Sequence, residues 1–340
     1  MDPALETLFY PFETGAIKCA APLDVLFFNA QGHPALSTIP ATRLTLQQYF
    51  KPDAAALQAQ GQPVTSLPES IAPPYDFALI RAPKSKPETQ YLLALAYSAL
   101  NEGGRLVVSA ANDAGGKSLE KMLATLGLAD TGHTAKNKCR VVWGTKPPTG
   151  NPIIHEWLNS GKMQEIPGGN FTSQPGIYGW NKIDRGSEIL AQTLPANLRG
   201  NGADFGCGYG YLSRHILETS TPASLLCIDA DFRALQCARE NLKGFTPDIR
   251  YLWEDLTAPA IAANTLDWIA MNPPFHEGKK TDIAIGTAFI KTAAASLRSG
   301  GTLYMVANTQ LPYEDILARH FKTLTKKHEG AGFKVFEAVK

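Results

Sequence analysis

The sequence repeats itself, because one pattern of strand, loop and helix signals occurs in both halves of the chain. Residues 76–108 (DFALIRAPKSKPETQYLLALAYSALNEGGRLVV) and 267–306 (DWIAMNPPFHEGKKTDIAIGTAFIKTAAASLRSGGTLYMV) each begin with Asp before a short apolar strand. In both, a Pro-containing loop, an Ala-rich helix, a Gly-Gly turn and a second apolar strand follow. A third echo is KCRVVWG at 138–144 against GFKVFEA at 332–338. Self-similarity over this length predicts two copies of one α/β domain.

The two copies are separated by a stretch rich in Pro and Gly. Residues 145–176 hold five Pro and five Gly, a composition typical of a connecting segment. We therefore expect a first domain over 1–150, a linker over 151–175 and a second domain over 176–340.

Apolar strands alternate with helices in the second domain. The strands are expected at 224–229, 249–253, 267–271 and 301–307, after a first strand that ends at Asp204. Alternation of this kind predicts a mostly parallel sheet covered on both faces. Such sheets bind ligands at the carboxyl ends of their strands.

A glycine-rich loop, DFGCGYG, lies between the first strand of the second domain and the following helix. Glycines at alternate positions let the backbone approach a ligand closely and adopt positive φ. Dinucleotide-binding dehydrogenases carry similar loops, but a carboxylate at Asp204 would repel a pyrophosphate. The Asp204 carboxylate instead suits a ligand that carries a positively charged ammonium and sulfonium. We predict that Asp204, Gly206, Gly208 and Gly210 bind such a cofactor.

Acidic residues follow the next two strands. Asp229 ends the strand SLLCID, where a carboxylate accepts both hydroxyls of a bound ribose. Asp255 follows the third strand and could accept a hydrogen bond from an adenine amino group, or it could be a solvated loop residue. The spacing therefore predicts that a nucleoside binds at this edge of the sheet.

The most specific motif is Asn-Pro-Pro-Phe, directly after the strand that ends at Met271. Consecutive prolines fix φ and remove two N–H donors, so the loop is rigid and presents carbonyl acceptors. An NH2 group needs two acceptors, which the Asn272 side chain and the Pro273 carbonyl provide; its lone pair then faces a methyl donor. Phe275 offers a flat face for a base pulled out of its stack. We predict methyl transfer driven by positioning, without a nucleophilic side chain or a metal.

Cysteine content and the lengths of the apolar runs indicate the cellular compartment. Five cysteines without a CxxC pair are typical of free thiols in a reducing compartment, and Cys and His show no metal-ligand spacing. No apolar run approaches ~18 residues, and the acidic N-terminus lacks the pattern of a signal peptide. We expect a cytoplasmic protein with no membrane span and no metal site.

A net charge of +1 argues against nonspecific binding to long nucleic acid, so any RNA contacts would come from local basic groups. Candidates are Arg81, Lys84, Lys86, Lys136, Lys138, Arg140 and Lys146 in the first half, and Lys279 and Lys280 beside the predicted pocket. Each group could instead be solvated surface, and His276 could line the pocket rim or lie exposed.

Together these motifs resemble the small-subunit ribosomal RNA guanine-N2 methyltransferases of bacteria, the RsmC family. The resemblance rests on DFGCGYG, IDAD, NPPFHEG and VANTQLPY, and on PGIYGWNKIDRGSEIL at 175–190, where Asp184, Gly186 and Ser187 match. It implies two tandem Rossmann-like methyltransferase domains and S-adenosylmethionine as cofactor, and it adds Asp184 and Ala230 to the cofactor site. The implied substrate is a guanosine N2 amine of 16S rRNA, within an assembled small ribosomal subunit.

The first copy lacks both motifs. Residues 24–35 (DVLFFNAQGHPA) hold no GxGxG, and RAPK at 81–84 stands where NPPF would be. We therefore expect a degenerate N-terminal copy that does not bind the cofactor, supports the catalytic domain and helps to hold RNA.

Other functions fit parts of the pattern. NPPF also occurs where adenine N6 or a protein glutamine is methylated, and a relative acts on the large-subunit 23S rRNA. A non-catalytic ribosome-assembly factor could keep the fold as a binding module, although the intact motifs favour catalysis. Product analysis separates the first group, and calorimetry with S-adenosylmethionine tests the second.

Overall fold

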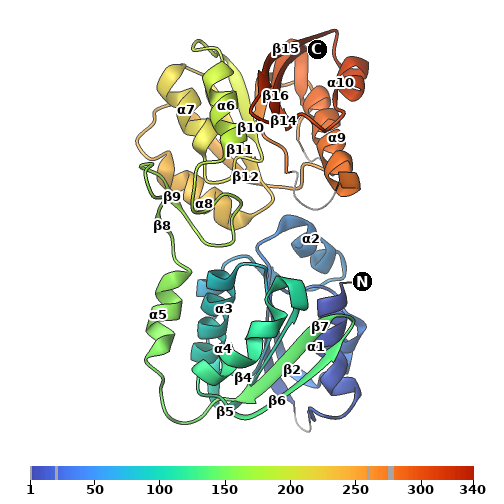
Figure 1. The fold of residues 1–340 in the computed structure, drawn as a ribbon, viewed down its shortest axis with the longest axis vertical. Coiled ribbons are helices and arrows are strands. Elements are labelled where there is room, and N and C mark those ends of the chain that lie inside the picture. The colour runs from blue at the N-terminus through green and yellow to red at the C-terminus, as the bar shows by residue number, and fades with distance from the viewer. Residues whose placement is uncertain (1, 20–21, 259–260, 275–278) are drawn as a thin grey trace. The chain divides into compact units, whose positions relative to one another are not determined.

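The computed structural model describes residues 2–19, 22–258, 261–274 and 279–340. The chain forms two compact units, Met1–Lys162 and Met163–Lys340, each built around its own sheet (Figure 1). The division falls inside the Pro- and Gly-rich stretch, and helix α5 packs on α3 within the first unit.

The first unit has a seven-stranded sheet in the order β3-β2-β1-β4-β5-β7-β6. Its helices are α1 (Pro3–Glu13), α2 (Lys51–Ala59), α3 (Lys86–Ala99), α4 (Leu119–Thr125) and α5 (Ile153–Ser160). Its strands are β1 (Leu23–Phe28), β2 (Ala41–Gln47), β3 (Val64–Thr65), β4 (Tyr75–Arg81), β5 (Leu100–Ala111), β6 (Ala129–Lys136) and β7 (Cys139–Thr145).

The second unit has a seven-stranded sheet in the order β12-β11-β10-β13-β14-β16-β15. Its helices are α6 (Arg185–Thr193), α7 (Tyr211–Thr219), α8 (Phe232–Asn241), α9 (Lys279–Ser296) and α10 (Glu314–His320). The sheet strands are β10 (Asn201–Phe205), β11 (Ser224–Asp229), β12 (Asp248–Trp253), β13 (Leu266–Met271), β14 (Leu297–Asn308), β15 (Thr323–Gly330) and β16 (Phe333–Val339). A separate two-stranded sheet joins β8 (Gln164–Glu165) to β9 (Thr172–Ser173).

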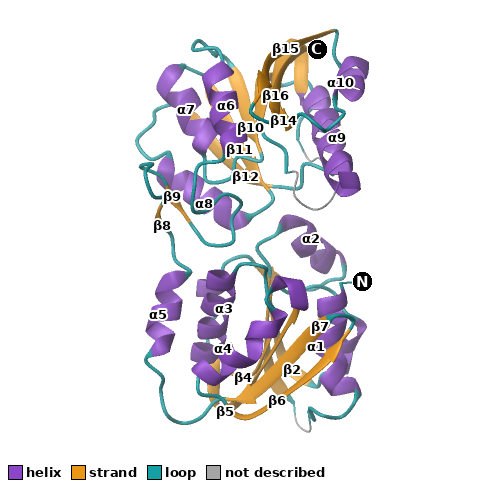
Figure 2. Cartoon of the chain, viewed as in Figure 1, coloured by secondary structure: helices purple, strands orange, loops and turns teal. Residues whose placement is uncertain are grey.

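The two large sheets share one strand order, which confirms the predicted duplication. Figure 2 shows that each unit combines strands with flanking helices. In the first sheet, neighbouring strands from β3 to β5 pair in parallel, and β7 pairs antiparallel with both β5 and β6. In the second sheet, neighbouring strands from β12 to β14 pair in parallel, and β16 pairs antiparallel with both β14 and β15. The register also repeats. Phe28 pairs with Ile80 of β4, as Phe205 pairs with Met271 of β13.

Helices cover both faces of the sheet in the second unit, with α6, α7 and α8 on one side and α9 and α10 on the other (Figure 1). Strand β13 shows the consequence for sequence. Trp268 and Ala270 pack with the first set of helices, and Ile269 and Met271 pack with the second. Because successive side chains alternate between two buried faces, the strand is apolar throughout.

The Gly-Gly pairs differ in detail from the prediction. Gly103 and Gly300 have φ of 75° and 78°, yet they lie inside β5 and β14 rather than in turns before them. The register of each strand against its neighbour shifts there. The glycines therefore mark an irregularity in a longer strand, where positive φ is needed without ending the pairing.

Among the described residues, no helix combines the length and the hydrophobicity that crossing a bilayer requires.

Candidate active site

Three motifs meet at one edge of the sheet in the second unit. Strands β10, β11 and β13 are parallel neighbours, so their carboxyl ends lie together. The glycine loop follows β10, Asp229 ends β11 and Asn272 follows β13. Gly208 donates its N–H to Asp229, and Gly208 and Asn272 line the same pocket.

The glycine loop is tied to β11 and is open on its other side. Gly206 and Cys207 both donate their N–H groups to the Ile228 carbonyl at 2.9 Å. The three glycines have φ of 72°, 55° and 89° in chain order. A Cβ at Gly208 would meet nothing within 4 Å, whereas one at Gly210 would lie 3.3 Å from Ala238 of α8. Gly210 therefore allows two helices to pack, and Gly208 leaves backbone accessible to a ligand.

The Asp229 carboxylate is held by backbone donors on both oxygens. Oδ2 accepts from Gly208 N–H and Oδ1 accepts from Asp231 N–H, each at 2.8 Å. Burial raises the pKa of Asp229 to about 7, although these hydrogen bonds oppose the shift. A carboxylate oxygen can accept more than one hydrogen bond, so Asp229 keeps acceptor capacity for a ligand.

Asp204 lies beneath the glycine loop and is fully buried. Its Oδ2 accepts from the N–H of Ser213 at 3.0 Å and from the hydroxyl of Ser213 at 2.7 Å, in the first turns of α7. Its Oδ1 has no hydrogen-bond partner among the described residues. Burial raises the pKa of Asp204 to about 6. This carboxylate is absent from the pocket lining, and its visible bonds anchor α7 against β10.

The Asn272 side chain is held on its nitrogen side. Nδ2 donates to Asp184 Oδ2 and to Ser187 Oγ, both at 2.8 Å. Oδ1 is buried and has no hydrogen-bond partner among the described residues. A buried acceptor without a partner is costly unless a ligand satisfies it, so this oxygen marks where a donor would bind.

Sequence reasoning missed several residues of this pocket. Tyr178 donates its hydroxyl hydrogen to Asp184 Oδ1 at 2.9 Å, Tyr209 lies within the glycine loop, and Tyr211 directly follows it. The two loop tyrosines lie inside or next to the GxGxG motif, which was the available signal. The complete lining is Tyr178, Asp184, Ser187, Gly206, Cys207, Gly208, Tyr209, Tyr211, Leu212 and Asn272.

The remaining predicted site residues lie around this edge. Pro273 is buried directly after Asn272. The Ala230 carbonyl accepts from the Trp253 indole at 2.8 Å, and Asp255 Oδ1 accepts from both the N–H and the hydroxyl of Thr257. The predicted roles of Phe275 and His276 lie outside the described residues, and Lys279 and Lys280 are described only as the start of α9. Within the described ranges, no three His, Cys, Asp or Glu side chains form a metal-binding group.

The corresponding place in the first unit can be found from strand register. Gln47 pairs with Phe28 as Ile228 pairs with Phe205. Gln48 therefore corresponds to Asp229, and its Oε1 accepts from Phe50 N–H, two residues on, as Asp229 accepts from Asp231. By the same register, Arg81 corresponds to Asn272.

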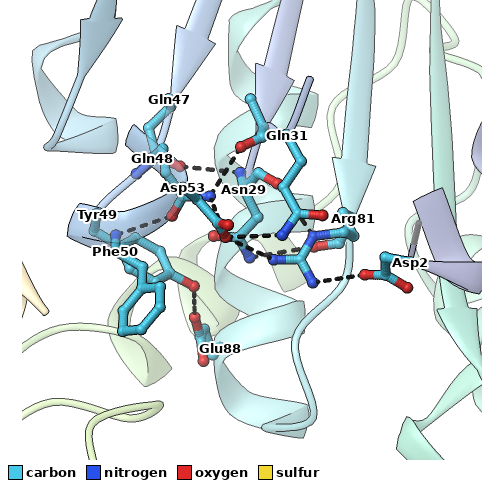
Figure 3. Close-up of polar contacts among 11 residues, drawn as sticks. Asp2, Asn29, Gln31, Gln47, Gln48, Tyr49, Phe50, Asp53, Arg81 and Glu88 are labelled. Carbon is cyan, nitrogen blue, oxygen red and sulfur yellow. Dashed lines mark hydrogen bonds and ion pairs between the residues drawn. The ribbon is translucent and has the colours of Figure 1, made fainter. Parts of the chain in front are cut away.

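Side chains fill this place in the first unit (Figure 3). The Arg81 guanidinium contacts Asp2 at 3.1 Å and Asp53 at 3.6 Å. Asp53 also accepts from Gln31 at 2.9 Å and from Gln48 at 3.3 Å. Gln31 stands where the second unit has Gly208, so a side chain enters the space that glycine leaves open.

The basic groups of the first unit divide into paired and exposed residues. Arg81 belongs to the network of Figure 3, Arg140 pairs with Glu120, and Lys136 lies 3.9 Å from Glu13. Lys84, Lys86 and Lys138 are exposed. Arg81 is thus committed to carboxylates of its own domain.

Two family profiles match the chain. The family described as methyltransferase small domain matches residues 168–337, and the methyltransferase small domain N-terminal family matches residues 25–160. The two matches correspond to the two sheets.

Two similar proteins carry the same name. The ribosomal RNA small subunit methyltransferase C of Shewanella pealeana is 31% identical over 273 residues, covering 78% of each chain. The protein of that name from Alteromonas mediterranea is 30% identical, over 77% of this chain and 72% of its own.

A solved structure from T. thermophilus, a 16S rRNA N2 methyltransferase in complex with AdoMet and guanosine, aligns with a TM-score of 0.82. It is 24% identical, and the match covers 100% of this chain and 92% of that one. At this identity the likeness establishes the fold alone, two tandem α/β domains. The two family profiles identify these domains as methyltransferase domains, which confirms the predicted Rossmann-like methyltransferase class.

Proposed function

Because the chain belongs to the ribosomal RNA small subunit methyltransferase C family, we propose that it methylates the N2 amine of a guanosine in 16S rRNA. The methyl donor is S-adenosylmethionine, which supplies a methyl group already activated on a sulfonium. The observation that carries the proposal is the buried Asn272 Oδ1, an acceptor without a partner among the described residues, beside the open backbone of Gly208.

The chain's contribution is to orient the substrate amine. Asn272 Oδ1 accepts one hydrogen of the NH2 group and the Pro273 carbonyl accepts the other, so the nitrogen lone pair points toward the methyl donor. Phe275 supports the base. No side chain forms a covalent bond, and positioning provides most of the rate enhancement.

The residues present fit this cofactor. Asp229 retains acceptor capacity for ribose hydroxyls, and Gly206 and Gly208 let the backbone approach the cofactor. Gly210, which was also predicted to bind the cofactor, acts instead by letting α7 pack closely against α8. We assign Asp255 and Ala230 to the adenine side of the site. Asp204 acts from beneath the loop, since it orients α7 and places negative charge near the ligand's cationic end.

We place the reaction in the cytoplasm, on 16S rRNA within an assembled small ribosomal subunit. The exposed Lys84 and Lys86 of the first unit are suited to phosphate contacts, whereas Arg81 is not. The transfer needs no metal, because the sulfonium already activates the methyl group.

The test compares rRNA from a deletion strain with rRNA from the parent, followed by methylation in vitro. N2-methylguanosine in 16S rRNA should be absent from the deletion strain and restored when the purified protein acts on small subunits. Loss of a mark in 23S rRNA, of N6-methyladenosine or of a methylated protein glutamine would contradict the proposal and identify the alternative.

Replacing Asn272 tests the role of its oxygen. Asn272→Ala should lower kcat by at least 100-fold, about 2.7 kcal/mol, and leave the cofactor Kd within about threefold by calorimetry. Activity within tenfold of wild type would show that Asn272 does not orient the amine.

A further inference from the structure

The Asn272 amide is asymmetrically satisfied. Both of its observed bonds are made by Nδ2, to Asp184 Oδ2 and to Ser187 Oγ at 2.8 Å. Its oxygen makes none among the described residues, although it is buried. Both N–H groups of this amide are therefore hydrogen-bonded to the protein, and its oxygen is left to accept a hydrogen bond from a ligand.

The chemistry of Asp184 fixes which way the amide points. An ionised carboxylate has only acceptors, so a reversed amide would place the Asn272 oxygen against a carboxylate oxygen. Reversal would also turn two donors toward the substrate amine, which itself donates. Hydrogen bonds to a charged partner are roughly twice as strong as neutral ones, so Asp184 holds the productive orientation firmly.

Asp184 is itself held in place by its own helix. Its Oδ2 caps α6 by accepting from Ser187 N–H at 2.9 Å, and its Oδ1 accepts from the Tyr178 hydroxyl at 2.9 Å. Ile189 and Leu190 bury α6 in the core of the unit. The carboxylate thus reaches Asn272, 88 residues away in sequence, from a rigid support.

We propose that Asp184 and Ser187 are positioning residues that fix the Asn272 amide with its oxygen toward the substrate NH2 group. The inference rests on the proposed function, because it assigns the free oxygen to an amine substrate. Asp184 then acts on the reaction through Asn272 rather than as a ligand of the cofactor. An acceptor oriented before the substrate arrives needs no reorganisation during the reaction.

Two replacements of Asp184 separate orientation from helix capping. Asp184→Ser keeps an N-cap oxygen for α6, but its side chain is too short to reach Asn272. Asp184→Asn can keep an oxygen facing both Ser187 N–H and Asn272 Nδ2, with its own NH2 toward the Tyr178 hydroxyl. We expect Asp184→Ser to lower kcat by about 10- to 100-fold and Asp184→Asn by less than fivefold.

Two further measurements distinguish positioning of Asn272 from cofactor binding and from a purely structural role of α6: the affinity for the cofactor and a control variant at the far end of α6. The Kd for S-adenosylmethionine should stay within about threefold in both variants. Thr193→Ala removes hydroxyl bonds at the end of α6 and should leave kcat unchanged. If Asp184→Ser weakens cofactor binding as much as it lowers kcat/KM, Asp184 is a cofactor ligand and the proposal is wrong.

A measurement without substrate keeps the proposal independent of the assigned RNA. The side-chain NH2 signal of Asn272, identified by its loss in Asn272→Ala, should exchange slowly with solvent in NMR spectra of the wild-type chain. Exchange should be at least tenfold faster in Asp184→Ser and faster in Ser187→Ala. Wild-type exchange as fast as that of an exposed asparagine would overturn the proposal, whichever substrate the enzyme uses.

Discussion

At the scale of single residues, the buried Asp229 carboxylate costs stability at the place where we propose that the cofactor ribose binds. Burial raises its pKa to about 7, so the folded protein disfavours the ionised form that a ribose requires. Because the pKa of Asp229 is higher in the folded protein than in the unfolded chain, its contribution to stability is fully present below the pKa of the unfolded chain. The contribution is lost as the pH rises through the pKa of the folded protein, here about 7.

We expect Asp229→Asn to remove the stability cost of the ionised Asp229 carboxylate. Between pH 5 and pH 8 the variant should gain about 2–3 kcal/mol of stability relative to wild type, or ~5–10 °C in Tm. Thermal unfolding at both pH values, without cofactor, provides the measurement. A difference that shrinks as pH rises would show that the Asp229 carboxylate is not destabilised by burial.

The cofactor affinity should depend on pH in the opposite sense. Since ribose hydroxyls bind the ionised carboxylate, the wild-type Kd should rise up to tenfold per pH unit below about 7. Asp229→Asn should bind weakly and without this dependence, as calorimetry across pH 5.5–8 would reveal.

At this scale, the sequence allowed us to predict which residues belong to the site more readily than which residues contact one another. Motif spacing was enough to predict Asn272, Asp229 and the glycines as site residues, because the predicted chemistry depends on following a strand. The bond from Asn272 to Asp184 spans 88 positions and has no local pattern, so only the folded chain reveals it. The same limit applies to Asp204, whose observed partner is Ser213 of α7.

At the scale of elements, the carboxyl ends of β1, β2 and β4 carry ion pairs at the place where the second unit has its proposed ligand site. Arg81 links Asp2, the N-cap of α1, to Asp53 in the first turn of α2. The side chains are 24–30% exposed, so screening weakens the pairs without abolishing them. The network therefore stabilises the meeting point of two helices and a strand.

Arg81→Ala should destabilise the first unit by about 1 kcal/mol, because two carboxylates lose their shared cation. Denaturant unfolding followed by a probe in that unit provides the measurement. Arg250→Ala, followed by a probe in the second unit, is the control, since the Arg250–Asp248 pair of that unit is 69% and 60% exposed and should contribute almost nothing. Equal effects of the two variants would contradict a structural role for the network.

The alternation of elements was predictable where strands are buried on both faces, as β11 and β13 are. The edge strands β6 and β15 were not, because both are polar: β6 reads ADTGHTAK and β15 reads TLTKKHEG. Polar and charged residues protect a sheet edge from pairing with other chains, and they also erase the hydrophobic pattern on which prediction depends.

At the scale of the whole molecule, two units of one topology have unequal sites. The second unit has an open glycine loop and a carboxylate at Asp229, and the first has Gln31 and Gln48 at these places. We expect one molecule of S-adenosylmethionine to bind per chain. Calorimetry on the full chain should give a stoichiometry of one, and Asp229→Ala should remove that binding. A second binding event that survives in Asp229→Ala would show that the first unit is functional.

The network around Arg81 also bears on the history of the chain. Restoring an acid at Gln48 would place it beside Asp53, 3.3 Å from the present amide, and restoring Asn at Arg81 would strand two carboxylates. Each of these single changes is therefore expected to lower stability unless the neighbouring charges change with it. Regaining a ligand site in the first unit would thus require several coordinated substitutions rather than one.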